Sequence, residues 1–382
     1  MNAAVCDEHE TIRSVYIHVP FCVHRCGYCD FTLVARRDDL IPRYLGMLAV
    51  ELRQLEHRRG VDTIFIGGGT PTHLDVDQLK QLMSLLSEWF EWDDEVEFSV
   101  EANPFGLTPD KVSVLADAGV NRISLGVQSF DDDLLKILER DHRGPEIEAA
   151  ISAVRHRIDN LAMDLIFGIP GQTIESWSKT LDRAVSFQPC HLSTYGLTFE
   201  KGTTFWSRLQ RRELDAVSDG EERRMYEIAM DQLPLSGYAQ YEISNFAQPE
   251  KRCRHNEVYW NGGSYWGFGP GAARHDAGRR EQNHRSVFTW LKRLEHGLSA
   301  AVECEQLDGE QRARELAVLK LRTARGLDLA DFEKRYGWSV SGLLGSRFED
   351  LLGTGWLERK DGFLRLTREG RCFADSIAVE FL

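Results

Sequence analysis

Three cysteines lie within eight residues in the segment YIHVPFCVHRCGYCDF, which spans residues 16–31. Three residues separate Cys22 from Cys26, and two residues separate Cys26 from Cys29. Three thiolates can hold three irons of a 4Fe-4S cube and leave the fourth iron open to a small-molecule ligand. An iron-sulfur cluster with one open iron is therefore our first hypothesis for this segment.

Other uses of clustered cysteines have to be weighed against it. A disulfide framework is disfavoured, because three clustered cysteines leave one unpaired and the first residues, MNAAVCDEHE, contain no apolar signal segment. A zinc site stays open as an alternative, since His18 and His24 lie beside the cysteines, although zinc usually takes four ligands in paired short spacings. Tyr28, directly before the last cysteine, makes the pattern more specific than a lone C-x2-C pair.

Composition describes an ordinary globular protein of one large domain with a smaller appendage. The chain has 382 residues, of which 42% are hydrophobic and 28% charged, and no apolar run reaches the length of a membrane span. Its net charge of -14 disfavours nucleic acid as a partner, because phosphate binding needs concentrated Lys and Arg. We expect a cytoplasmic location, where reducing conditions suit an oxygen-sensitive cluster.

Short apolar runs alternate with amphipathic helical patterns in the first half of the chain, which is typical of βα units around a parallel sheet. Six such units predict an α/β fold, an incomplete (β/α)6 barrel of the TIM type, whose chemistry gathers at the carboxyl ends of the strands. The predicted strands are Val15–Val19, Thr63–Ile66, Val96–Val100, Arg122–Val127, Leu161–Phe167 and Leu192–Thr198.

The chain divides into four predicted parts: an N-terminal tail (1–13), the partial barrel (14–235), a barrel-edge and linker region (236–300) and a C-terminal domain (301–382). In the third part, Tyr238–Phe246 alternates in polarity, and we expect it to form a strand at the open edge of the barrel.

The fourth part predicts a smaller, winged-helix-like α+β domain. A hairpin with Asp361-Gly362 at its turn follows three expected helices, Gln311–Arg322, Leu329–Tyr336 and Val340–Leu352. Residues 301–382 hold 13 Lys or Arg against 15 Asp or Glu, so no basic excess favours DNA binding. A structural or partner-docking role is the better interpretation.

Glycines and polar side chains follow the barrel strands. Gly67-Gly68-Gly69-Thr70-Pro71 comes after the second strand, where glycines let backbone amides approach a ligand, with a structural turn as the alternative. The turn lacks the order of a dinucleotide or phosphate-binding loop. Glu101, Gln128 and Asp164 come at or near the ends of the next three strands. Because these ends meet at one rim of a barrel, we expect one shared site.

The cysteine spacing resembles the cluster motif of the radical S-adenosylmethionine (SAM) superfamily, and GGGTP resembles its segment for the methionine end of SAM. The resemblance implies that SAM binds the open iron and that an electron from the cluster cleaves it to a 5'-deoxyadenosyl radical. The strand ends resemble the branch of anaerobic coproporphyrinogen oxidases. For Arg140 and Asp164, an ion pair supporting the barrel is the alternative role. The implied SAM contacts are Tyr16, Tyr28, Gly68, Gly69, Thr70, Glu101, Gln128, Arg140, Asp164 and Gly196.

A second segment of interest, CRHNEVYW, runs from Cys253 to Trp260. A structural turn is one interpretation, but an imidazole can also be an axial ligand of haem iron, and aromatic rings can stack on a porphyrin. The run HNxxYW, with YEISNFA before it and the closing LTREGRCFADSIAVEFL, resembles the HemW family of haem chaperones. This resemblance implies His255 as axial ligand, Cys253 in reserve, and Tyr259 and Trp260 as the wall of a haem pocket.

The same resemblance implies a protein that binds haem and delivers it to client haemoproteins, with an electron donor as a further partner. The cluster would then serve redox gating or dimerisation, so a homodimer is one expected state. The alternative function is that of an oxygen-independent coproporphyrinogen III dehydrogenase. That enzyme has another cysteine where this chain has Phe31, and a long extension where only 21 residues precede Cys22. A departure from the family pattern is Gly27, at a position where proline is usual.

Overall fold

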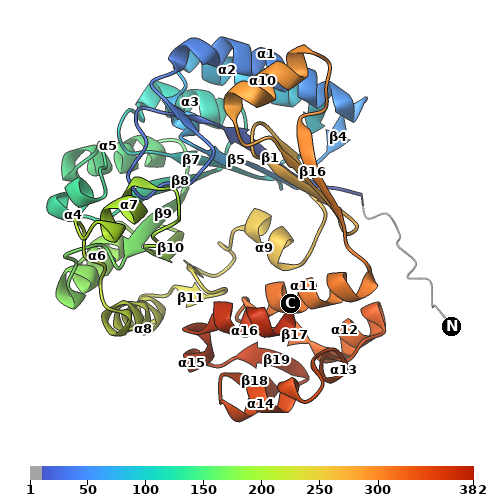
Figure 1. Ribbon diagram of the computed structural model, residues 1–382. Coiled ribbons are helices and arrows are strands. Elements are labelled where there is room, and N and C mark those ends of the chain that lie inside the picture. The colour runs from blue at the N-terminus through green and yellow to red at the C-terminus, as the bar shows by residue number, and fades with distance from the viewer. Residues whose placement is uncertain (1–10) are drawn as a thin grey trace.

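A nine-stranded sheet curls into an incomplete barrel at the centre of the computed structural model, which describes residues 11–382 (Figure 1). Six parallel strands form the body of this sheet and neighbour one another in chain order. All six predicted strands are confirmed, with ends that differ by at most two residues. They are β1 (Ser14–Val19), β5 (Thr63–Gly68), β7 (Glu97–Ala102), β8 (Arg122–Gln128), β9 (Asn160–Phe167) and β10 (His191–Gly196).

The two edges of the sheet differ from the sequence prediction. Beside β1 lies a further parallel strand, β13 (Trp266–Phe268), which the glycine-rich sequence did not reveal. At the other edge, the predicted strand Tyr238–Phe246 is wrong as a single element, because it is broken into antiparallel β11 (Ala239–Gln240) and β12 (Asn245–Ala247). The break has a physical cause: Glu242 turns to accept the amide of Ser244 and bridges to the C-terminal domain.

The barrel strands place apolar side chains outward and polar side chains inward. On β8, Ile123 and Leu125 belong to the main hydrophobic core, whereas Arg122 and Ser124 line the interior cavity. Neighbouring β7 repeats the pattern, with Phe98 in the core. Strands of a covered parallel sheet are usually apolar on both faces. The inner face of this sheet therefore lines a cavity instead of packing against a second apolar layer.

Helices cover the outer face of the barrel (Figure 1). Asp75 begins α2 with a capping box to Gln78, and Thr108 accepts the amide of Lys111 at the start of α3. The helices are α1 (Ile41–Leu52), α2 (Val76–Trp89), α3 (Pro109–Asp117), α4 (Asp132–Ile137), α5 (Gly144–Arg155), α6 (Ile174–Ser186), α7 (Thr204–Gln210) and α8 (Asp219–Leu235). Four two-residue strands, β2 (Phe21–Cys22), β3 (Val34–Ala35), β4 (Arg59–Gly60) and β6 (Phe90–Glu91), pair beside them.

The linker region and the first residues of the predicted C-terminal domain form a small antiparallel sheet that the sequence did not predict. It consists of β14 (Ala273–Asp276), β15 (Arg279–Asn283) and β16 (Ala301–Gln306), with α10 (Val287–Glu295) packed against α1. The buried carboxylate of Glu51, on α1, fixes this region by accepting the amide of Gly269 at 2.9 Å and the Nδ2 amide of Asn283 at 2.6 Å. Burial raises the pKa of Glu51 to about 7, and these hydrogen bonds oppose the rise.

We expect Glu51→Ala to lower the free energy of unfolding by about 3 kcal/mol, because two buried donors lose their shared acceptor. Urea denaturation of the two proteins measures the difference. Glu148→Ala is the matched control, since Glu148 makes only an exposed ion pair with Arg183 and its loss is expected to cost less than about 1 kcal/mol. Equal losses in the two variants would contradict the role of Glu51.

The C-terminal residues form a winged-helix-like unit with its own hydrophobic core, from Ala313 to Phe381. The hairpin turn at Asp361-Gly362 is confirmed, with both residues at positive φ. The predicted helix Val340–Leu352 is wrong as one element, because Gly345, at φ 58°, divides it. The elements are α11 (Gly309–Leu321), β17 (Leu327–Asp328), α12 (Leu329–Tyr336), α13 (Val340–Leu344), α14 (Arg347–Gly353), β18 (Leu357–Lys360), β19 (Phe363–Leu366), α15 (Arg368–Arg371) and α16 (Ala374–Phe381).

Between the barrel and this unit lies the short helix α9 (Arg254–Trp260), in contact with β5 on one side and α11 on the other (Figure 1). Arg13, in the predicted tail, already belongs to the barrel through an ion pair with Asp62 at 2.6 Å; residues 1–10 of that tail lie outside the described part. Within residues 11–382, no helix combines the length and apolar character that crossing a bilayer requires.

Candidate functional site

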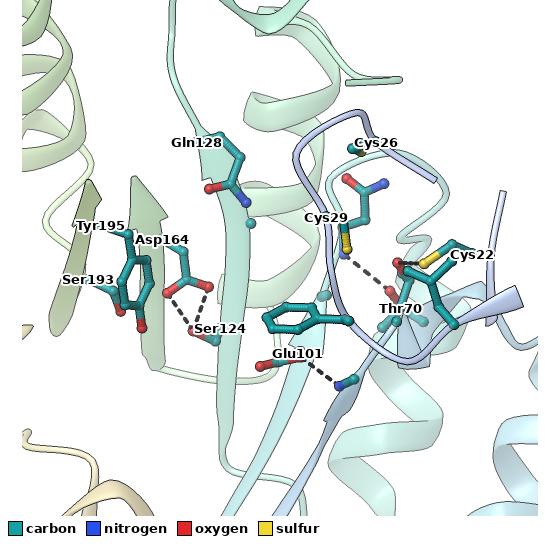
Figure 2. A pocket seen from close by; sticks show the side chains of 18 of the residues that line it. Cys22, Cys26, Cys29, Thr70, Glu101, Ser124, Gln128, Asp164, Ser193 and Tyr195 are labelled. Carbon is teal, nitrogen blue, oxygen red and sulfur yellow. Dashed lines mark hydrogen bonds between the residues drawn. The ribbon is translucent and has the colours of Figure 1, made fainter. Parts of the chain in front are cut away.

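One cavity of about 760 Å³ extends from the cysteine segment along the inner face of the barrel to α9. Figure 2 shows its polar strand residues facing the cysteine segment. The cavity brings together nearly all of the predicted site residues from both segments of interest. They are Tyr16, Cys22, Cys26, Tyr28, Cys29, Gly68, Gly69, Thr70, Glu101, Gln128, Arg140, Asp164, Gly196, Cys253, His255 and Tyr259.

The cysteine segment leaves β1 and is held in a compact loop by its own polar groups. Arg25 donates to the carbonyl oxygens of Cys29 at 3.1 Å, Phe31 at 3.2 Å and Leu33 at 2.9 Å. The amide of Cys29 also donates to the carbonyl of Cys26 at 3.1 Å. All three cysteines of this loop line the same cavity.

Gly27, where the family pattern has proline, lies against the buried ring of Phe205. A Cβ atom at position 27 would come within 2.4 Å of that ring, and the amide of Phe205 donates to the carbonyl of Gly27 at 2.8 Å. Position 27 therefore requires glycine, because the ring of Phe205, on α7, fills the space of a side chain. With glycine there, all three cysteines still line the cavity.

The glycine turn after β5 passes directly against the cysteine segment. The amide of Gly69 donates to Val19 at 2.9 Å and that of Thr70 to Phe21 at 2.8 Å. A Cβ on Gly69 would lie 2.8 Å from the carbonyl oxygen of Phe21 and 3.1 Å from Sγ of Cys22. Only glycine allows this approach, which also brings the Thr70 hydroxyl to 3.3 Å from the Cys22 thiol.

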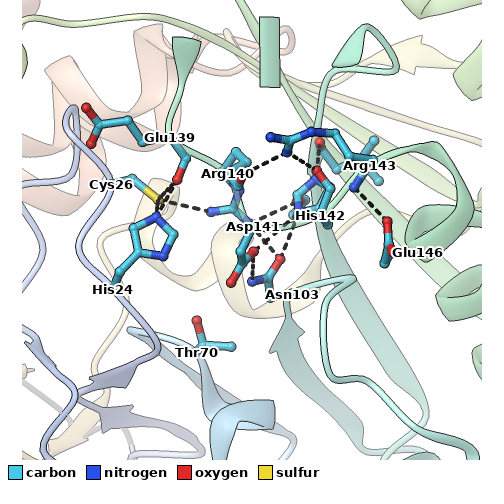
Figure 3. A network of polar contacts seen from close by, with 12 residues as sticks. His24, Cys26, Thr70, Asn103, Glu139, Arg140, Asp141, His142, Arg143 and Glu146 are labelled. Carbon is cyan, nitrogen blue, oxygen red and sulfur yellow. Dashed lines mark hydrogen bonds and ion pairs between the residues drawn. The ribbon is translucent and has the colours of Figure 1, made fainter. Parts of the chain in front are cut away.

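Cys26 lies at the edge of a polar network that Figure 3 shows. Its Sγ is 3.7 Å from Nε2 of His24 and from Nη1 of Arg140. Burial opposes ionisation of Cys26, but the hydrogen bonds from His24 and Arg140 outweigh it and lower the pKa of this thiol. Arg140 also donates to Oδ1 of Asn103 at 2.8 Å, and Asn103 donates to Asp141 at 2.8 Å.

The suggested ion pair between Arg140 and Asp164 is not among the ion pairs formed by residues 11–382. Asp164 instead accepts the hydroxyl of Ser124, at 3.1 and 3.2 Å from its two oxygens. Burial raises the pKa of Asp164, which disfavours the charged form in the absence of a cation.

Glu101 faces Asp164 from the neighbouring side of the cavity (Figure 2). It accepts the amide of Gly68 at 3.0 Å. Burial, followed by the charge of Asp164, raises the pKa of Glu101 to about 8. Gln128 ends β8 at a bulge with φ 64°, a backbone conformation that directs its amide into the same space. Two confined carboxylates beside an amide favour a cationic ligand with hydroxyl groups.

The HNxxYW segment lies inside the molecule at the opposite end of the cavity. Glu97, on β7, accepts the backbone amides of Arg254 at 2.9 Å and His255 at 3.0 Å, and so caps α9. The imidazole of His255 has Thr63 Oγ1 at 2.8 Å from Nδ1 and the Tyr259 hydroxyl at 2.7 Å from Nε2. Burial lowers the pKa of His255 to about 3, so the ring is neutral, which is the form that binds metals.

Trp260 is the exception among the predicted residues. Its ring lies under the guanidinium of Arg322, with 5.6 Å between Cζ and the ring centroid, and it is not among the described residues that line the cavity. The predicted wall of a haem pocket is therefore represented at the cavity by Tyr259 alone.

Glu97→Ala is expected to release α9, because two buried amides lose their acceptor, at a cost of about 2–4 kcal/mol. Hydrogen exchange of residues 253–260 should accelerate while exchange in β9 and α6 stays slow. Glu95→Ala is the control, since Arg254 donates to the backbone carbonyl of Glu95, which alanine keeps. Unchanged exchange in α9 of the Glu97 variant would contradict this assignment.

Several residues of the site belong to no recognisable motif. Glu97, Arg122 and His191 are the buried first residues of β7, β8 and β10, and they contribute polar groups to the barrel interior. The signal that identifies them is strict alternation: EFSVEA and RISLGVQ place a polar residue or glycine at every second position of strands expected to be covered.

The residues present fit an iron-sulfur cluster and SAM on grounds of chemistry and shape. Three cysteines line one cavity, a glycine turn leaves no room for a side chain beside Cys22, and Nε of Arg140 is buried without a hydrogen-bond partner among the described residues. Such a set of donors matches a cluster ligated by cysteine with space for an attached ligand.

Comparison with known proteins agrees with this geometry. A family model described as the radical SAM superfamily matches residues 16–184, and one described as the HemN C-terminal domain matches residues 307–373. Coproporphyrinogen III oxidase (HemN) from Escherichia coli has a solved structure with a TM-score of 0.87 at 23% identity, over 99% of this chain and 91% of that one. The likeness shows a shared fold.

Two similar proteins carry the name heme chaperone HemW. That of Bacillus subtilis (strain 168) is 35% identical over 97% of this chain and 99% of its own length. That of Mycobacterium tuberculosis (strain ATCC 25618 / H37Rv) is 35% identical over 96% of this chain and 94% of its own length. By its cysteine segment, its fold and its identity with these relatives along almost the whole chain, the protein belongs to the radical SAM superfamily and, within it, to the HemW family.

Proposed function

We propose that this protein is a haem chaperone: it binds haem and delivers it to client haemoproteins, while Cys22, Cys26 and Cys29 hold a 4Fe-4S cluster with SAM beside it. The observation that carries the proposal is that His255, Asn256 and Tyr259 of the HNxxYW segment line the same cavity as the three cysteines. The relatives named heme chaperone support it. A cytoplasmic location, an external electron donor and a homodimer belong to the same proposal.

The chain's own residues have distinct parts in this proposal. The cluster would supply one-electron chemistry to bound SAM. Glu101 and Asp164 attract the sulfonium charge and pair with hydroxyl groups, while Gln128 and Tyr16 present hydrogen-bonding groups to the rest of the nucleoside. His255 offers the haem iron a neutral nitrogen once the Tyr259 hydroxyl leaves Nε2.

Haem titration of the reconstituted protein tests this function. The parent protein is expected to shift the Soret band, and His255→Ala to weaken haem binding by about tenfold or more, the loss that follows when about 1.4 kcal/mol of ligand energy is removed. His275→Ala is the matched control, because both ring nitrogens of His275 bond to the backbone: Nε2 accepts the amide of Gly278 in the β14–β15 turn at 3.2 Å, and Nδ1 lies 3.0 Å from the carbonyl oxygen of Gly263. Equal haem affinity of the parent and His255→Ala would refute the ligand assignment.

The coproporphyrinogen III dehydrogenase activity remains the second candidate, because the fold is that of HemN. Phe31, at the position of that enzyme's extra cysteine, is 60% exposed beside the cavity and offers no thiol there. Incubation with coproporphyrinogen III, SAM and a reductant should therefore yield no protoporphyrinogen. Formation of that product at a catalytic rate would replace the chaperone proposal by the enzymatic one.

A further inference from the structure

Arg122 is a buried cation that lacks a direct ion-pair partner in the described part of the chain. It is the first residue of β8, is 2% exposed and lines the cavity. Both of its hydrogen bonds leave from Nη1, to Oδ1 of Asn160 at 3.4 Å and to the carbonyl of Lys251 at 3.2 Å. None of the ion pairs formed by residues 11–382 includes it. Burying a guanidinium in this way is costly unless an anion pairs with it.

His191, at the start of β10, adds a second unsatisfied group to the same cavity. It is 2% exposed, and its Nδ1 has no hydrogen-bond partner among the described residues. Its Nε2 lies 2.9 Å from the hydroxyl of Tyr241, whose oxygen already accepts the amide of Cys253 at 3.3 Å. The Tyr241 proton is thus available to Nε2, which leaves the proton of a neutral imidazole on Nδ1 as a free donor.

The neighbouring acids make no ion pair with Arg122 within residues 11–382, and their oxygens accept hydrogen bonds from other groups, although the charge of Arg122 opposes the rise that burial causes in the pKa of Asp164. Glu97 accepts the amides at the start of α9, and Asp164 accepts the hydroxyl of Ser124. Ser99, the register partner of Arg122 on β7, is fully buried, and its hydroxyl has no partner within residues 11–382. The base of the barrel therefore gathers donors that lack an acceptor.

We propose that Arg122 and His191 form an anion site, the lumen floor, that binds a carboxylate of a small molecule inside the barrel. We favour a haem propionate as the carboxylate, because Cys253 and His255 line the same cavity. In that case the inference rests on the haem-binding function proposed above. A forked guanidinium and a single imidazole N–H suit the two oxygens of a carboxylate. A free small carboxylate is the other source of the same chemistry.

Haem and its dimethyl ester, which lacks both carboxylates, are the probes that distinguish the sources. We expect Arg122→Gln to weaken haem binding by about tenfold, the loss of roughly one charge-assisted bond, and to leave binding of the ester unchanged. Arg122→Lys keeps the charge without the forked geometry, so its haem affinity should lie between those of the parent and Arg122→Gln. Arg183→Gln, at an exposed ion pair with Glu148, is the matched control. Succinate, tested by thermal shift, probes the free carboxylate.

The outcomes separate cleanly. Loss of haem but not ester affinity in Arg122→Gln assigns a propionate, and loss of succinate stabilisation alone assigns a free carboxylate. If the parent protein binds no haem, the proposed function is wrong. The thermal-shift experiment with succinate then still tests whether the lumen floor binds a carboxylate. Without ligand, Arg122→Gln should melt no lower than the parent, because it removes an unpaired buried charge. A much lower melting temperature, or equal binding of haem and succinate by both proteins, would overturn the proposal.

Discussion

Gly69→Ala is expected to abolish assembly of the cluster. The new Cβ would lie 2.8 Å from the carbonyl oxygen of Phe21 and 3.1 Å from Sγ of Cys22, and backbone cannot yield as a flexible side chain does. Overpacking of this kind costs about 1–3 kcal/mol, and here the strain displaces one of three cluster thiols. Iron and sulfide per chain after anaerobic reconstitution should fall roughly tenfold or more, together with the broad sulfur-to-iron absorption at about 400 nm.

Gly46→Ala is the control for this experiment. Gly46 lies within α1, and a Cβ added there meets nothing within 4 Å. Alanine should therefore raise stability by up to about 1 kcal/mol and leave the iron content unchanged. Full iron content in Gly69→Ala would show that the glycine turn does not shape the cysteine segment, and stoichiometric zinc in the parent would revive the zinc alternative.

Glu101→Gln should make the protein more stable while weakening its affinity for SAM. Burial raises the pKa of Glu101 from 4.5 to about 8, so the folded protein holds this proton more tightly than the unfolded chain does. Protonated Glu101 therefore contributes its full stability below the pKa of the unfolded chain, and this contribution is lost as the pH rises toward 8. Glutamine keeps the acceptor for Gly68 without the charge, so the gain should be on the order of 3 kcal/mol at pH 7 and small at pH 5.

Denaturation of both proteins at a series of pH values measures this gain, with Glu148→Gln as an exposed control. In equilibrium binding, Glu101→Gln should lose about tenfold in SAM affinity, because the carboxylate no longer attracts the sulfonium. Parallel stability curves for the parent and Glu101→Gln between pH 5 and pH 8 would contradict the raised pKa. Unchanged SAM affinity would remove Glu101 from the binding site.

The barrel and the cysteine segment were predictable because their signals are local. Each strand is a short apolar run between helical patterns, and the spacing of three cysteines within eight residues is visible in the sequence itself. The short strand β13 was not predictable, because Trp266–Phe268 forms a strand by pairing with β1 and its own composition does not favour one. The split of Val340–Leu352 likewise depends on one glycine at positive φ.

The position of the HNxxYW segment was beyond sequence reasoning for a different reason. His255 and Glu97 are 158 residues apart, and the bond that fixes α9 against the barrel exists only after the sheet has formed. Arg122 and His191 were missed because a charged residue at the start of a strand looks like an exposed one. Their alternation with core residues was visible, but its meaning depends on which face the helices cover.

The contact between Gly27 and Phe205 constrains how this lineage can change. Because the buried ring occupies the volume that a Cβ at position 27 needs, proline at position 27 does not fit while the Phe205 ring stays where it is. The two positions are therefore coupled: a larger residue at 27 requires a smaller or displaced side chain at 205. Relatives with proline in the cysteine segment should carry a smaller or displaced side chain at the position of Phe205.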